Sequence, residues 1–113
     1  MTKKPKILVV CSRNKKRSLT AEKIYKNDQR LIVRSVGTSP KAKRKITKLD
    51  ADWSDIIICM ENKHRQIIQK LFGKNNLPTI IVLNIEDEYE FMDLELIKML
   101  EAGIEEILEY IHW

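Results

Sequence analysis

The apolar positions of this chain gather in four short runs that are rich in β-branched residues. They lie at residues 7–10, 31–36, 56–60 and 79–83. Continuous apolar runs of this length predict strands that are buried on both faces, as in a parallel sheet. The stretches between them are long enough for helical crossovers. The pattern therefore predicts an α/β fold, a three-layer doubly wound domain around a four-stranded parallel sheet.

Helical periodicity appears between and after these runs. The segment 62–72 places its apolar residues on one face and stops at Gly73, a typical C-terminal signal. Residues 94–111 form the longest predicted helix, with an apolar stripe, a glutamate-lined exposed side and Asp93 as its N-cap. A further short helix is predicted over 41–49.

Composition agrees with a small globular protein. The chain has 113 residues, 43% of them apolar and 33% charged, which predicts a single domain spanning 1–113. Two cysteines are too few for a disulfide-rich fold. No Cys/His cluster has metal-ligand spacing, so we expect no metal and no cofactor. The N-terminus is too short for a signal peptide and no run could span a bilayer, which predicts a cytoplasmic protein.

Charge is distributed unevenly along the chain. Residues 1–50 hold 16 Lys/Arg and 3 Asp/Glu, hence +13, whereas residues 51–113 hold 5 and 13, hence −8. A basic segment such as 41–45 could contact the phosphates of a nucleic acid, although it lacks interleaved aromatic residues for stacking. A solvated basic face that steers anionic substrates is the simpler interpretation.

The most informative chemical feature is Cys11, which follows the first apolar run directly. A basic loop, Ser12-Arg13-Asn14-Lys15-Lys16-Arg17-Ser18, separates it from a predicted helix over 19–25. Backbone N–H groups at a helix N-terminus have no intrahelical partner and favour a bound anion. The same dipoles and the cationic side chains favour the thiolate form of a cysteine, which is a nucleophile. The alternative is that Cys11 is an inert, packed thiol.

Two residues at the end of this loop suit phosphate chemistry. The planar guanidinium of Arg17 can hold two oxygens of a transferring phosphoryl group at once, which a lysine cannot do. The Ser18 hydroxyl can donate a hydrogen bond to the sulfur. The loop therefore predicts a phosphate site built around a nucleophilic cysteine, with residues 12–18 binding the phosphate.

Residues 6–37 resemble the N-terminal unit of the low molecular weight protein tyrosine phosphatases. That family carries a cysteine, five residues and then Arg-Ser between its first strand and first helix, and Asn14 falls at its loop asparagine. Residues 51–60 are similar to the family's third strand, so the resemblance covers most of the chain. It is the resemblance expected of a short and divergent member of the family. It implies a strand order of 2-1-3-4.

The resemblance also implies the remaining site residues. Residues 85–89 are similar to the family's Ile-Pro-Asp-Pro-Tyr segment, which assigns the general acid to Asp87 and a substrate-pocket wall to Tyr89. The implied activity is hydrolysis of phosphotyrosine or other aryl or small phosphates through a cysteinyl-phosphate, with a phosphorylated small molecule or phosphoprotein as partner. If Asp87 is not the acid, it belongs to a solvated acidic turn.

The loop departs from the family pattern at two positions. Arg13 stands where the family usually has glycine, which restricts backbone conformations with positive φ, and Lys16 stands where a second cysteine is common. The added cations predict a preference for more highly charged phosphates, or for phosphates flanked by acidic groups. The chain is also short between its second and third strands, which predicts a more open pocket and weaker selectivity for aromatic phosphates.

Three other functions remain open at this point. The first is a non-catalytic phosphate or nucleic-acid binding module that keeps the loop for recognition. The second is an arsenate reductase-like enzyme, but only Cys59 is available as a further thiol, and we expect it to be a packed core residue. The third is a phosphoryl carrier of the sugar-transport type, against which Arg17 and Asp87 both argue. His64 is expected at the surface.

Overall fold

The computed structural model describes residues 4–111. Its elements, in chain order, are β1 (Lys6–Cys11), α1 (Arg17–Tyr25), β2 (Ile32–Gly37), α2 (Lys48–Trp53), β3 (Ile56–Cys59), α3 (Asn62–Phe72), a short 3-10 turn (Lys74–Asn76), β4 (Thr79–Val82) and α4 (Leu94–Tyr110). All four predicted strands are present. No helix within residues 4–111 has the length and apolarity needed to cross a membrane.

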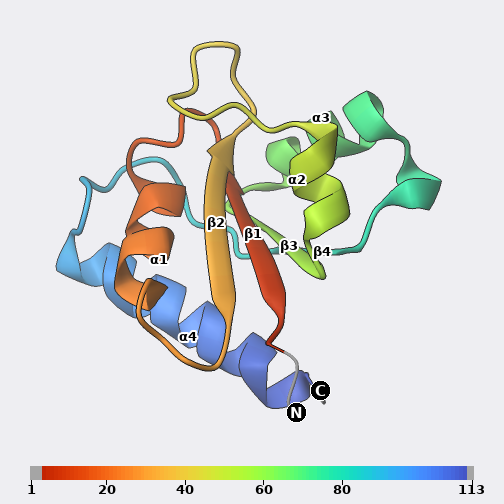
Figure 1. Ribbon diagram of the computed structural model, residues 1–113. Helices are drawn as coiled ribbons and strands as arrows, with labels where there is room; N and C mark the ends of the chain where they lie inside the picture. The colour runs from red at the N-terminus through yellow and green to blue at the C-terminus, as the bar shows by residue number, and fades with distance from the viewer. Residues whose placement is uncertain (1–3, 112–113) are drawn as a thin grey trace.

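The four strands form one parallel sheet in the order β2-β1-β3-β4, as the sequence predicted (Figure 1). At its centre, Val9 on β1 lies opposite Ser35 on β2 and Ile58 on β3. Because every strand runs the same way, their carboxyl ends lie along one edge of the sheet. The loop after β1, the loop after β2 and the residues that follow β3 and β4 therefore meet there, at the switch point that favours ligand binding in such sheets.

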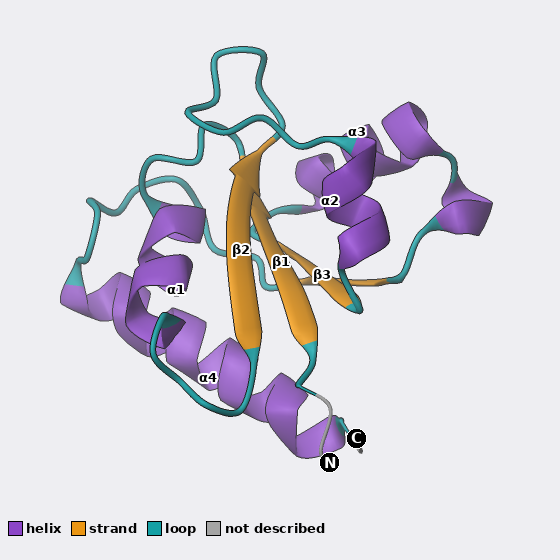
Figure 2. Ribbon diagram, in the orientation of Figure 1, coloured by secondary structure: helices purple, strands orange, loops and turns teal. Residues whose placement is uncertain are grey.

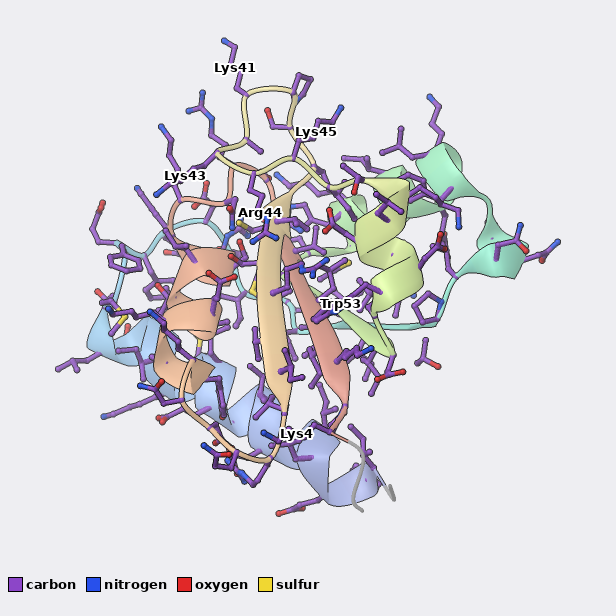
Figure 3. All side chains as sticks on the ribbon, viewed as in Figure 1. Lys4, Lys41, Lys43, Arg44, Lys45 and Trp53 are labelled. Atoms are coloured by element: carbon purple, nitrogen blue, oxygen red, sulfur yellow. The ribbon has the colours of Figure 1, made fainter. Side chains whose placement is uncertain are left out.

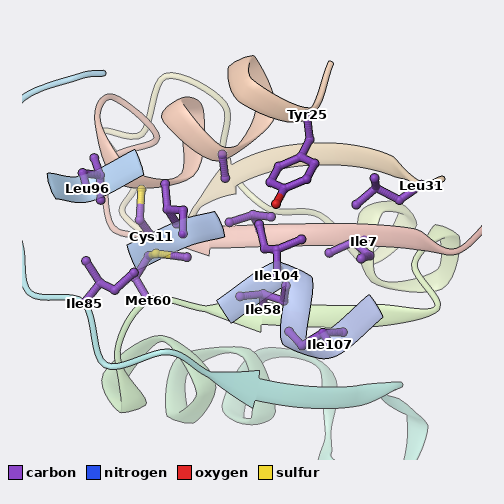
Figure 4. Packing of buried hydrophobic residues seen from close by; sticks show 13 residues of the cluster. Ile7, Cys11, Tyr25, Leu31, Ile58, Met60, Ile85, Leu96, Ile104 and Ile107 are labelled. Carbon is purple, nitrogen blue, oxygen red and sulfur yellow. The ribbon is translucent and has the colours of Figure 1, made fainter. Parts of the chain in front are cut away.

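Helices cover both faces of the sheet, which confirms the three-layer architecture. Side chains alternate between the faces along each strand. Ile7, Val9 and Cys11 on one face join a core cluster with residues of α1 and α4, whereas Leu8 and Val10 on the other join a cluster with residues of α2 and α3. Figure 4 shows the first cluster, with Cys11 at the same end as Leu96 and Met60.

Helix boundaries follow the capping chemistry. The prediction of a helix over 41–49 is wrong: residues 38–46 form a loop, drawn in teal above the carboxyl end of β2 in Figure 2, and α2 begins only at Lys48. Thr47 starts this helix because its backbone N–H donates to Asp50 Oδ2 at 2.9 Å while its hydroxyl accepts from Asp50 N–H. Asp93 caps α4 as predicted, accepting from Glu95 N–H at 2.8 Å.

Candidate functional site

The loop between β1 and α1 closes around the sulfur of Cys11. Cys11 is only 3% exposed, yet Sγ lies 2.9 Å from the Ser18 hydroxyl and accepts from the Asn14 N–H at 3.3 Å. The buried thiol therefore has polar partners of the kind that stabilise a thiolate, which distinguishes it from an inert core cysteine. It also faces the cavity described below.

Asn14 gives the loop its shape. Its φ of 55° lies in the left-handed region, which asparagine tolerates better than most residues, and its side-chain amide donates to Ser18 Oγ at 2.8 Å. Arg13 is not among the positive-φ residues of the described chain. The restriction that arginine places on positive φ at the family's glycine position therefore does not strain this loop.

Several backbone N–H groups of the loop are free to bind an anion. Within residues 4–111, the N–H groups of Arg13, Lys15 and Lys16 donate to no other residue. The loop ends at the first turn of α1, where the positive end of the helix dipole lies. A phosphate bound there would accept several charge-assisted hydrogen bonds.

Arg17 is buried and held from two sides. Its side chain is 2% exposed, and Nη1 donates both to the Glu61 carboxylate and to the Ile85 carbonyl, the latter at 2.8 Å. Nε and Nη2 donate to no other residue in the described part of the chain, although Nε lies 3.8 Å from Asp87 Oδ1. Two parallel donors of a preoriented guanidinium therefore remain for an oxyanion.

Glu61 is a site residue that the sequence reasoning missed. It lies two residues after the end of β3, so it is at the same sheet edge as the loop after β1. Partial burial raises the pKa of its carboxyl, but the hydrogen bond and the charge of Arg17 outweigh this effect, so the pKa lies below its ordinary value. The ionised carboxylate fixes the orientation of Arg17. A polar residue just after a buried strand that neighbours β1 is the signal that could have identified it.

His64 was expected at the surface, and that expectation is wrong. The side chain is fully buried at the start of α3, where its Nδ1 accepts from the Glu61 N–H at 3.0 Å. Nε2 therefore carries the proton and donates to Ser12 Oγ, 2.9 Å away. Burial, and next the positive charge of Arg17, lower the pKa of His64 to about 4, so the ring is neutral. It holds residues 12–18, the predicted phosphate loop, against α3.

The segment that carries Asp87 is tied to the phosphate loop and α1. Besides the Arg17 contact with the Ile85 carbonyl, Lys16 Nζ pairs with Glu90 at 3.3 Å, and the Met92 N–H donates to Thr20 Oγ1 at 3.0 Å. These contacts bring Asp87 over the loop although the two are far apart in the sequence.

Cys11, Arg17 and Asp87 meet at one cavity. Its volume is about 260 Å³, and its lining residues are Cys11, Arg13, Lys15, Lys16, Arg17 and Asp87. Ser12, Asn14 and Ser18 lie in the surrounding loop. Asn14 and Ser18 form hydrogen bonds with the Cys11 sulfur and with each other, whereas the Ser12 side chain pairs with His64. Tyr89 is half-buried and packs against the core cluster of α1 and α4, and is not one of the lining residues, so its pocket-wall role stays a prediction.

The second cysteine lies on the other side of the sheet. Cys59 is fully buried in the cluster that packs against α2 and α3, whereas Cys11 belongs to the opposite cluster, and both thiols are free. Burial raises the pKa of Cys59 to about 12. Cys59 is therefore the packed core residue that the sequence predicted. Among residues 4–111, no group of three or more His, Cys, Asp or Glu side chains could hold a metal ion.

Several solved structures are similar to this chain in fold. A low molecular weight protein tyrosine phosphatase from Streptococcus pyogenes is similar to this chain with a TM-score of 0.79 and 18% identity, over 96% of this chain and 94% of that one. The tyrosine phosphatase Wzb from Escherichia coli K30, in complex with phosphate, gives 0.74 and 19% over 97% and 100%. The YwlE arginine phosphatase from Geobacillus stearothermophilus gives 0.65 and 21% over 96% and 99%.

These similarities define the fold. The chain has the α/β fold of the low molecular weight protein tyrosine phosphatases over nearly its whole length, and the resemblance expected from residues 6–37 is confirmed at that level. No family model and no curated protein matches the sequence.

Proposed function

We propose that this protein is a cysteine-dependent phosphomonoesterase. The observation that carries the proposal is the meeting of Cys11, Arg17 and Asp87 at one cavity, with free loop N–H groups around them. The shared fold of proteins described as phosphatases supports it. Because those proteins include tyrosine and arginine phosphatases, the fold alone does not choose the substrate.

The first half of the reaction transfers the phosphoryl group to the enzyme. The Cys11 thiolate attacks phosphorus in line, and an S–P bond forms as the ester P–O bond breaks. Arg17 and the loop N–H groups hold the equatorial oxygens, while Asp87 gives its proton to the leaving oxygen. Protonation of this kind typically contributes about 10² to 10⁴ in rate.

The second half regenerates the enzyme. Asp87, now a carboxylate, takes a proton from a water molecule that attacks the cysteinyl-phosphate, and the S–P bond breaks to release inorganic phosphate and the thiolate. Asp87 is suited to both steps because its side chain is 56% exposed at the rim of the cavity, where leaving group and water arrive.

The test is hydrolysis of para-nitrophenyl phosphate from pH 5 to 8, with and without vanadate. Turnover should be abolished in Cys11→Ser, lowered about 10² to 10⁴-fold in Asp87→Asn, and blocked by vanadate. Lys4→Ala, at the opposite end of the sheet, is the control and should keep full activity. A folded wild type that binds phosphate without turnover would instead favour the non-catalytic binding module, and salt-sensitive RNA binding would identify its ligand.

A further inference from the structure

A second basic loop runs alongside the phosphate loop. Residues 38–46 are bonded to it backbone to backbone: the N–H groups of Thr38, Ser39 and Lys43 donate to the carbonyls of Cys11, Ser12 and Arg13 at 3.0, 2.9 and 3.0 Å. The two loops also touch at Gly37, where an added Cβ would lie 2.5 Å from the Ser12 carbonyl oxygen. The position of the second loop relative to Cys11 is therefore set by direct contacts.

This loop carries four cations in five residues. Figure 3 shows Lys41, Lys43, Arg44 and Lys45 together at the end of the molecule where β2 ends, with Lys4 at the other end. All four are exposed, and only Arg44 has an acidic partner within the described chain, Glu22 at 4.0 Å.

Two cations of the phosphate loop add to this charge. Arg13 and Lys15 are exposed, and neither forms an ion pair with any residue between 4 and 111. Clustered, unpaired cations produce a strongly positive local potential and favour binding of more than one negative charge.

Among residues 4–111, no aromatic or aliphatic residue lines the cavity. Its six lining residues comprise four cations, one acid and the cysteine. Tyr89 packs against the core, and Trp53 is covered by the Arg34 guanidinium, 4.0 Å from its ring centroid. The chemistry of the site therefore suits an ester whose remaining portion is anionic better than one whose remaining portion is aromatic.

We propose that the site binds small phosphate esters that carry a second phosphate group. The scissile phosphate lies over Cys11 and Arg17, and the second is held by Arg13 together with Lys43, whose backbones are joined by the 3.0 Å bond. Turnover of such esters rests on the proposed phosphatase function, but their binding does not. A peptide substrate would need a groove next to the cavity for its flanking residues. The large apolar groove between β4 and α4 shares no residue with the cavity, so a compact ligand is favoured over a peptide.

Binding can be measured without catalysis, using Cys11→Ser protein and calorimetry with propane-1,3-bisphosphonate and propylphosphonate. Two added charge-assisted contacts predict that the bisphosphonate binds about 30-fold more tightly, with a ratio that shrinks as salt rises. Lys43→Ala in the same background removes one of the two contacts and should reduce the ratio to about fivefold. Lys4→Ala is the matched control, because Lys4 is an exposed lysine far from both loops, and should keep the wild-type ratio.

Three results would overturn the proposal. They are equal affinity for the two phosphonates, an unchanged ratio in a folded Lys43→Ala protein, and tighter binding of an acidic phosphoserine peptide than of the bisphosphonate. Circular dichroism of each variant shows whether it is folded.

Turnover separates this proposal from the phosphatase function. Release of inorganic phosphate from fructose 1,6-bisphosphate should exceed that from fructose 6-phosphate by a factor similar to the binding ratio. If the bisphosphonate preference is found but para-nitrophenyl phosphate is not hydrolysed, the second-phosphate site stands and the phosphatase function fails. If para-nitrophenyl phosphate is hydrolysed and the bisphosphonate preference is missing, the phosphatase function stands and the second-phosphate site fails.

Discussion

The buried histidine makes the stability of this protein depend on pH in a window where few other groups titrate. His64 has a pKa of about 4 in the folded chain and about 6.5 when unfolded. The unfolded chain therefore binds the proton more readily, so the stabilisation is fully present above pH 6.5 and is lost as the pH falls toward 4. From these two values, lowering the pH from 7 to 5 removes about 2 kcal/mol from the free energy of unfolding.

The assay is urea unfolding followed by circular dichroism at pH 7, 6 and 5. The matched variant is His64→Asn, whose amide oxygen can still accept from the Glu61 N–H but does not titrate. The variant should be less stable than the wild type at pH 7, because it loses the contact with Ser12, and should lose much less stability between pH 7 and 5. Glu61 does not interfere, because its pKa is lowered and its contribution is lost only at more acidic pH.

An equal loss of stability in both proteins between pH 7 and 5 would show that His64 is not the group responsible. His112 lies outside the described residues and is present in both, so its titration cancels in the comparison. A loss confined to the wild type, with a midpoint that moves by the expected amount at constant denaturant slope, would establish that His64 is neutral and buried.

Three further outcomes follow from the contacts. Gly37→Ala should destabilise the fold by about 1–3 kcal/mol and slow para-nitrophenyl phosphate hydrolysis, because the new Cβ would meet the Ser12 carbonyl at 2.5 Å; an unchanged melting temperature would contradict this. Tyr25→Phe should cost about 1 kcal/mol in urea unfolding, because its hydroxyl donates to Glu105 at 2.8 Å, and a gain in stability would contradict it. Iodoacetamide at neutral pH should alkylate the loop cysteine and spare Cys59, since burial raises the pKa of that thiol to about 12; mass spectrometry decides, and labelling of Cys59 in the folded protein would show that it is accessible.

Local patterns were sufficient for most of the fold. The β-branched runs predicted four strands because such runs suit a sheet buried on both faces, and Gly73 and Asp93 marked the ends of helices by conformation and capping. The one misplaced element was the helix over 41–49. Its composition permits a helix, but the backbone there is hydrogen-bonded to the phosphate loop. A local sequence pattern cannot predict a hydrogen-bond partner that lies elsewhere in the chain.

The chemistry predicted for the loop can be deduced from local sequence, since Cys11, Arg17 and Ser18 stand close together after a strand and before a helix. Which distant residues contact the loop depends on how the chain folds. Glu61 reaches Arg17, His64 reaches Ser12, and Lys43 lies beside Arg13, because the carboxyl ends of parallel strands meet at one edge of the sheet. Only folding brings those segments together, and the side chains that position the site are therefore absent from any local motif.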